Sequence, residues 1–276
     1  MKRNKTIRTL LALAFIVFSC SLVLIPLYFT VLNSFKPYSE IAANIAALPK
    51  NVTLGNFAEA WERLHYPRVL ANTLIITVFS AVGIVILSGM SGYWITRHSN
   101  WFTRLCFVLI LCGMSVPFQC IMITFAKMIG LLKLGNRYLG VIISNWTFSL
   151  PMSVFLVTGA VKSLPIEIEE SAVIDGCTPI SLYWRIVFPL TKGTMFTIVS
   201  LEVLKYWNNY LMTQFILTKP QMRTIQIAMM SLFNEALFSW DVAVAAVTLS
   251  ILPLFIFFVI AQKQVLSSAT VGAVKG

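Results

Sequence analysis

Long hydrophobic stretches separated by short polar segments run along most of the chain. Five of the stretches contain no charged residue, and a sixth contains two. A helix that crosses the hydrocarbon core of a bilayer needs about 20 apolar residues. The pattern therefore predicts six membrane-spanning helices, over Leu10–Leu32, Val69–Thr96, Leu105–Ala126, Tyr138–Val161, Thr194–Leu217 and Val242–Gln262.

Composition supports a lipid-embedded protein. The chain has 276 residues, of which 58% are hydrophobic and only 11% are charged, whereas an average globular protein has about a quarter charged residues. So few charges could not solvate the surface of a soluble protein of this size, which excludes an ordinary cytosolic enzyme. The alternating pattern of barrel strands is also missing. We expect an all-α, polytopic membrane protein with a single transmembrane domain over residues 1–276.

The net charge of +11 bears on topology. The basic residues form no aromatic-interleaved patch, so a nucleic-acid partner is not expected. Four cations in the first eight residues precede an apolar run that is too long for a signal peptide. Because cationic flanks stay inside, we expect a multi-pass protein of the cytoplasmic membrane with both termini in the cytoplasm. The five scattered cysteines indicate neither a disulfide framework nor a metal site.

The loop between the fourth and fifth predicted spans, residues 162–193, is long enough for two short helices. Pro165 followed by three glutamates favours a helix start, because acids suit the positive end of the helix dipole. Asp175-Gly176 is expected to end this helix, since glycine takes the left-handed position without a steric penalty. The loop therefore predicts a helix–turn–helix on the cytoplasmic side.

The second helix of this loop is predicted from Thr178-Pro179, an N-cap and first-turn pair, to Pro189, which is expected to stop it. Four of its residues recur at helical spacing and form one apolar face: Ile180, Tyr183, Trp184 and Val187. That face needs a surface to cover it. Either its own bundle and the lipid headgroups do so, or it docks into a groove on a partner protein.

These residues resemble a known motif. Glu170-Ser171-Ala172, Asp175-Gly176 and Phe188-Pro189-Leu190 are similar to the EAA loop of ABC-importer permeases, with Ser171 where alanine is typical. Over nearly the whole chain the sequence resembles the maltose-transporter-type carbohydrate permeases, and within them the shorter, second permease subunit. The further matching segments are Phe35-Lys36-Pro37, Asn72-Thr73, Trp207-Asn208 and the terminal Gly272-Ala273-Val274-Lys275-Gly276.

The resemblance implies a subunit of a binding-protein-dependent importer that moves a sugar or oligosaccharide by alternating access. Implied partners are a second homologous permease, two cytoplasmic ATP-binding subunits, an extracytoplasmic solute-binding protein and membrane lipid. ATP and Mg²⁺ would bind the ATPase, and this chain would hold no cofactor. Lys275 of the tail would reach the ATPase. The residues that would couple to it are Glu170, Ser171, Ala172, Asp175, Gly176, Ile180, Tyr183, Trp184 and Val187.

The chain has no GxxxxGK[ST] motif, so it is not expected to hydrolyse ATP and is not predicted to be an enzyme. Gly89-Met90-Ser91-Gly92 matches a short motif of intramembrane serine proteases. The two histidines, His65 and His98, lie in loops at opposite membrane faces, which leaves Ser91 without a base. Helix packing explains the small residues better. An ion channel is disfavoured because no filter-like sequence appears. Within the importer class, the solute could instead be a phosphorylated polyol or another small molecule.

Polar residues inside the fifth predicted span have two interpretations. Glu202, Lys205, Asn209 and Thr213 recur along one helical stripe. Because ionisable groups in a span usually face protein or water, Glu202 and Lys205 near its inner end are interpreted as a structural ion pair. Asn208, Asn209 and Tyr210 either pack against neighbouring helices or line the translocation path and bind sugar hydroxyls.

Overall fold

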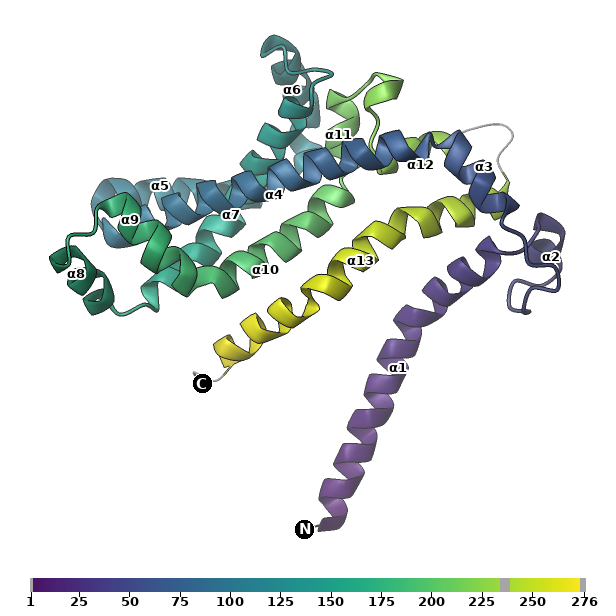
Figure 1. Ribbon diagram of the computed structural model, residues 1–276, viewed down its shortest axis with the longest axis horizontal. Helices are drawn as coiled ribbons and strands as arrows, with labels where there is room; N and C mark the ends of the chain where they lie inside the picture. Colours follow the sequence, from purple (N-terminus) through teal and green to yellow (C-terminus); the bar gives the residue numbers. More distant parts are fainter. Residues whose placement is uncertain (1, 234–238, 274–276) are drawn as a thin grey trace. The chain divides into compact units, whose positions relative to one another are not determined.

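The computed structural model describes residues 2–233 and 239–273, with side chains over 8–233 and 239–262, and its regular elements there are all helices (Figure 1). This confirms the all-α prediction. The helices are α1 Lys2–Ser34, α2 Tyr38–Ala43, α3 Gly55–Arg63, α4 Tyr66–Arg97, α5 Trp101–Cys112, η1 Gly113–Ser115, α6 Phe118–Leu131, α7 Tyr138–Lys162, α8 Ile166–Ile174, α9 Pro179–Leu182, η2 Tyr183–Val187, α10 Phe188–Trp207, α11 Leu211–Ile216, η3 Pro220–Met222, α12 Ile225–Phe233 and α13 Trp240–Ala273.

Five helical segments in the described part of the chain are long and apolar enough to cross a membrane, and a bent pair of helices makes a sixth if it is counted as one span. The five segments are Arg8–Ser34, Tyr66–Arg97, Tyr138–Lys162, Pro179–Trp207 and Trp240–Gln262. The bent pair is Trp101–Ser115 with Phe118–Leu131. Each predicted span therefore has a helical counterpart, but the third and the fifth differ from their predictions.

The third predicted span, Leu105–Ala126, is broken rather than continuous. Its two halves, α5 and α6, are bent by 106°. A single 3₁₀ turn, η1, ends α5, and Val116 then adopts an extended backbone in front of Pro117, the N-cap residue of α6. Proline disfavours a helical conformation in the residue before it and lacks the N–H that a continuing helix needs. Hydropathy alone could not show this break, because both halves are apolar.

The fifth predicted span, Thr194–Leu217, has different bounds in the structure, where one continuous helical segment runs from Pro179 to Trp207. The prediction that Pro189 stops a loop helix was wrong. The π-helical turn η2 inserts a wider turn, in which the Phe188 N–H donates to the Tyr183 carbonyl. Pro189 then lies in the first turn of α10, where its missing N–H costs little.

The other end of this segment also differs. Asn208 is the C-cap of α10, and its side-chain Nδ2 donates to the Leu204 carbonyl at 2.9 Å. Leu211–Ile216 is a separate short helix, α11. Since the helix ends at Trp207, Asn209 and Thr213 do not continue the stripe that Glu202 and Lys205 begin.

The chain divides into two packing units, residues 1–67 with 228–253 and residues 68–227 with 254–276. In the second unit, α4, α7, η2 and α10 share one apolar core, which includes Ile84, Val157, Val187 and Ile198. A second cluster joins α4, α6, α7 and α11, with Phe125 and Ile216 among its buried members. These contacts support the segment after α7, where the predicted coupling residues lie.

The first unit carries the polar segment between α1 and α4. Lys36 is buried after the end of α1, and its Nζ donates to the carbonyls of Ile45 at 3.0 Å and Asn44 at 3.3 Å. Asn56 of α3 donates to the carbonyls of Ser34 and Lys36. These bonds tie a segment of low helical content back to the end of α1, so the loop is an ordered structure.

Candidate functional site: the α8–α9 arm

The predicted loop helix–turn–helix begins as expected. Helix α8 is followed by Asp175 as C-cap and by Gly176, which has a φ of +84°. The Gly176 N–H donates to Val173 and the Cys177 N–H donates to Ala172, each at 3.0 Å. These two bonds define a Schellman motif, in which glycine avoids the Cβ strain of a left-handed backbone. Thr178 then caps α9 by accepting from the Ser181 N–H.

We call residues 164–187 the α8–α9 arm. Its second helix does not present the single apolar face that the sequence predicts. Tyr183 and Val187 are 4% and 0% exposed and belong to the core of the second unit. Ile180 and Trp184 are 72% and 40% exposed. The π turn changes the 3.6-residue register between these positions. Two of the four residues therefore anchor the arm, and the other two are free to meet a partner.

The glutamates of α8 have different environments. Glu170, Ser171 and Asp175 are exposed, whereas Ala172 is buried. Glu169, which the sequence analysis used only as a helix-start signal, is also buried. Exposed Glu170 can offer its carboxylate to a cation on another protein. Buried Glu169 serves the interior of this chain.

Glu169 meets two residues from the end of α4. Its Oε1 accepts from Arg97 Nε at 2.8 Å, and its Oε2 accepts from the Tyr93 hydroxyl at 3.0 Å. Arg97 also donates to the Leu164 carbonyl at 3.3 Å. The two charged side chains are 15% and 7% exposed. We call these three residues the α4–α8 clamp. Its charge-assisted bonds hold the arm against a transmembrane helix.

The sequence signals for this clamp were weak. Glu169 is one of three glutamates in a row of five residues, and each of them fits a helix N-terminus equally well. What distinguishes Glu169 from the other two glutamates is its position on the buried face of α8, three residues before Ala172. Arg97 has no local signal beyond its place in the last turn of α4.

Glu202 and Lys205 are brought together in α10, with Nζ and Oε2 at 3.5 Å. Glu202 is buried and accepts a short hydrogen bond from the Ser149 hydroxyl of α7. Lys205 is 47% exposed and also donates to the Phe148 carbonyl at 3.2 Å. The pair lies near the C-terminal end of α10, because the helical segment that holds it runs from Pro179 to Trp207 and not from Thr194 to Leu217 as predicted.

The three predicted path residues occupy the break between α10 and α11. Asn209 donates to Asn145 Oδ1 at 3.2 Å, and Asn145 in turn donates to Ser80 Oγ at 2.9 Å. Asn208 is exposed; its Oδ1 accepts from Gln226 at 3.3 Å. Tyr210 packs beside the α6–α11 cluster. Asn209 thus belongs to a chain of amides and a hydroxyl that joins α4, α7 and the α10–α11 break.

Ser91 does not have the surroundings of a nucleophile. Its hydroxyl donates to the Leu87 carbonyl one turn earlier in α4. The flanking glycines allow close packing, since a Cβ at Gly92 would meet Val157 of α7 and one at Gly89 would meet Tyr183. The GxSG sequence is a packing motif in this helix, as the sequence analysis favoured.

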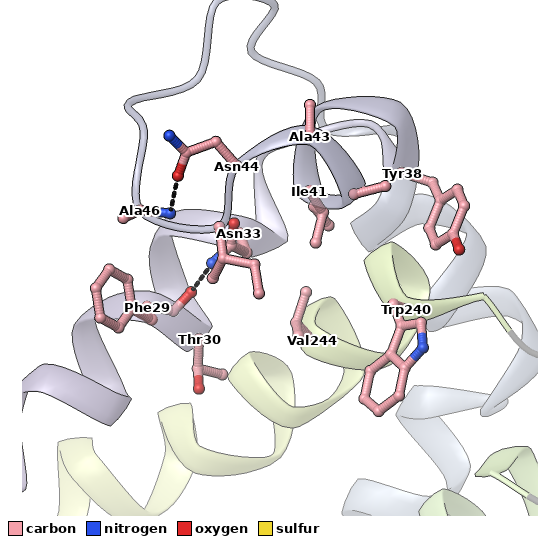
Figure 2. Close-up of a pocket in the computed structure, with 12 residues that line it drawn as sticks. Phe29, Thr30, Asn33, Tyr38, Ile41, Ala43, Asn44, Ala46, Trp240 and Val244 are labelled. Carbon is pink, nitrogen blue, oxygen red and sulfur yellow. Dashed lines mark hydrogen bonds between the residues drawn. The ribbon is translucent and has the colours of Figure 1, made fainter.

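A cavity of about 690 Å³ lies in the first unit, among the ends of α1 and α2 and the start of α13. Figure 2 shows Phe29, Tyr38 and Trp240 around it. Asn33 at its wall donates to the Phe29 carbonyl at 2.7 Å. The side chains around the cavity are apolar or neutral, so it offers contact area rather than charge recognition.

Lys275 of the C-terminal tail, which the resemblance placed against the ATPase, lies outside the described residues. The described part of the segment between α11 and α13 includes η3 and α12, and Ile225, Ala228 and Leu232 of α12 are buried.

The helical fold, the spans and the arm together define a multi-pass transport subunit of the membrane. Residues 84–269 match the family described as the binding-protein-dependent transport system inner membrane component. That match covers more than half of the chain, which therefore belongs to this family.

Known relatives agree with this assignment. The chain is 33% identical over 250 residues to the probable starch degradation products transport system permease protein AmyC of Thermoanaerobacterium thermosulfurigenes, covering 91% of each. It is 30% identical over 275 residues to the melibiose/raffinose/stachyose import permease protein MelC of Bacillus subtilis (strain 168), covering 99% of each. A crystal structure of a bacterial ABC transporter involved in alginate import has the same fold, with a TM-score of 0.83 at 20% identity over 95% of this chain and 97% of that one.

Proposed function

We propose that this chain is one permease subunit of an importer that takes up a sugar or oligosaccharide. The curated relatives that it matches along almost their full length carry names of starch-product, melibiose and arabinooligosaccharide transport systems. The amide-rich break between α10 and α11 suits hydroxylated solutes, because amides both donate and accept hydrogen bonds. A phosphorylated polyol is the rival solute.

The proposed energy source is a separate ATP-binding subunit that binds ATP and Mg²⁺. The observation that carries this proposal is the α8–α9 arm itself. It combines a glycine-dependent turn with three exposed apolar side chains, Ile174, Ile180 and Trp184, and with the exposed carboxylate of Glu170. Exposed apolar residues rimmed by charge are typical of a protein-docking surface.

Two connections would transmit movement of this arm into the bundle. One is the continuous helical segment from Pro179 to Trp207, which joins the arm to α10 directly. The other is the α4–α8 clamp, which joins the arm to α4. Packed helices move as rigid elements rather than deforming continuously. A shift of the arm on ATP binding would therefore move α4 and α10 together.

The remaining proposed partners are supported by the family, whose description is that of a binding-protein-dependent transport system. A second, homologous permease would complete the translocation path, and an extracytoplasmic solute-binding protein would deliver the sugar. The arm would face the cytoplasm, as would both chain termini, because four cations precede the first span. The Asn33–Arg68 segment would then lie on the opposite side, where the binding protein approaches.

The test is uptake together with co-purification of the ATP-binding subunit. Gly176→Val forces a β-branched residue into a left-handed backbone and should misdirect the arm. We expect the variant to insert into the membrane, to lose the ATPase on purification and to lose sugar uptake. Gly159→Ala is the matched control, since a Cβ there meets no atom within 4 Å. Normal sugar uptake by Gly176→Val would contradict the proposed role of the arm. If the natural protein took up a phosphorylated polyol but no sugar, the polyol would be the solute instead.

A further inference from the structure

A second cavity, of about 260 Å³, is lined by residues from the end of α4, the segment after it, α5 and the end of α7. Its lining contains two cations, Arg104 of α5 and Lys162 of α7, and no acidic residue. The other lining residues are the hydroxyl-bearing Thr96, Ser99 and Thr158 and the apolar Ile95 and Phe107. None of these residues was singled out by the sequence analysis as a binding site.

The two cations are available to a ligand. Among the described residues, neither Arg104 nor Lys162 takes part in an ion pair or a side-chain hydrogen bond. The nearby Arg97 differs, because Glu169 neutralises it. The Thr96 and Thr158 hydroxyls each donate to a backbone carbonyl of their own helix. Of the three hydroxyls in the lining, that of Ser99 is therefore the one that can donate to a ligand. The cavity therefore has an excess of two positive charges and needs an anion.

We propose that this cavity binds a phosphate group, and that its source is the headgroup of an anionic phospholipid. A guanidinium and an ammonium around one phosphate make charge-assisted hydrogen bonds. Basic cavities between transmembrane helices on the cytoplasmic side suit such headgroups. The cavity faces that side because α7 leads directly from it into the α8–α9 arm, and in this one respect the inference depends on the proposed orientation.

The neighbouring surface favours a lipid over free phosphate. On α5, Trp101 and Val108 lie three residues before and four after Arg104, so all three share one helix face. Trp101 and Val108 are both exposed. An indole at the membrane boundary is typical of the headgroup level. An acyl chain could run along this face while its phosphate sits between the two cations.

In the experiment, the full chain is purified with its accompanying subunits from a mixture of phosphatidylglycerol and phosphatidylcholine. Native mass spectrometry then identifies the lipid that stays bound. We expect the wild type to retain phosphatidylglycerol. The double variant Arg104→Gln/Lys162→Gln should bind it about 25-fold more weakly, from about fivefold for each cation. Arg185→Gln/Lys192→Gln is the matched control, because it removes one exposed arginine and one exposed lysine outside the cavity.

A second arm separates the two sources of phosphate. Sodium phosphate is compared with sodium chloride at equal ionic strength for its effect on the Tm of each variant. Retained phosphatidylglycerol that the cavity variant loses supports the lipid headgroup. If no lipid is retained but phosphate raises the Tm of the wild type and not of the cavity variant, the site binds phosphate from solution. If the cavity variant matches the wild type in both arms, the proposal is overturned.

Discussion

Two ion pairs in the described part of the second unit, Arg97–Glu169 and Lys205–Glu202, each join a basic residue to a glutamate but differ in the elements that they join. Arg97 and Glu169 are 72 residues apart and belong to different helices, and both side chains are largely buried. Lys205 and Glu202 are three residues apart in one helix, and the lysine is half exposed. The first pair links the arm to the bundle, whereas the second mainly satisfies a buried carboxylate.

The difference shows that an ion pair can couple two structural elements only if its members belong to different elements. A pair within one helix cannot transmit force between elements, since its members already move together. A pair between α4 and α8 can, because it resists their separation. In a buried setting, removing one partner leaves an uncompensated charge and costs about 3–5 kcal/mol. Exposed helical pairs typically contribute only about 0.3–0.5 kcal/mol.

The largest expected effect is at the α4–α8 clamp. Glu169→Ala should destabilise the arm by about 3–5 kcal/mol, because it leaves the Arg97 guanidinium and the Tyr93 hydroxyl without their acceptor. We expect the ATPase to remain bound while sugar uptake falls at least about tenfold. Uptake and ATP hydrolysis are measured together in reconstituted vesicles.

Glu170→Ala is the control for that variant, one residue away in the same helix but exposed. It should weaken ATPase retention without lowering the stability of the permease. If Glu169→Ala and Glu170→Ala have the same effects on stability and on retention, the division between an inner and an outer glutamate is wrong.

A smaller effect is expected for the pair in α10. A double-mutant cycle with Glu202→Gln and Lys205→Gln should give a coupling free energy of about 1 kcal/mol, because Lys205 is half exposed and Glu202 keeps its bond from Ser149. The same cycle with Arg97→Gln and Glu169→Gln should give a coupling of about 3 kcal/mol. Thermal unfolding in detergent measures both. Equal couplings would remove the contrast between the two pairs.

The two asparagines after α10 offer a comparison of the same kind. Asn209→Ala should cost about 1–2 kcal/mol, since it leaves Asn145 Oδ1 without its donor inside the bundle. Asn208→Ala should cost less, because that side chain is exposed and loses mainly a bond at the end of its helix. Unfolding measurements rank the two. A changed KM for sugar uptake in the more stable variant, Asn208→Ala, would assign it to the translocation path.

The smallest effect concerns the carboxylate of Glu40, which is held mainly by backbone N–H groups. Glu40 accepts backbone N–H bonds from Lys50 at 2.9 Å and Asn51 at 3.0 Å. The bond from Lys50 is the main cause that lowers the pKa of Glu40 below its ordinary value. Because the native pKa is depressed, the stabilisation of this loop is present above the unfolded pKa and is lost as pH falls through the native one.

Amide hydrogen exchange at Lys50 and Asn51 tests this dependence. After correction for intrinsic rates, protection should fall below about pH 4. In Glu40→Gln it should be lower and independent of pH over that range. Protection that stays constant in the natural protein down to pH 2 would contradict the role of this carboxylate.

The sequence by itself determined much of this protein. Apolar stretch length predicted six spans, since only helices can satisfy backbone hydrogen bonds in lipid. Asp175-Gly176 predicted the turn of the arm, because the left-handed backbone at Gly176 is a local requirement that glycine meets. The resemblance of the loop to the EAA motif predicted the family to which the chain belongs.

Only the tertiary structure decided the rest. The bend at Pro117, the passage of the helix through Pro189 and the division of the apolar face after Ile180 depend on turns whose register hydropathy does not record. The α4–α8 clamp and the cationic cavity depend on residues far apart in sequence that packing brings together. Local backbone conformation depends on neighbouring residues, whereas the partner of a buried charge depends on how the whole chain packs.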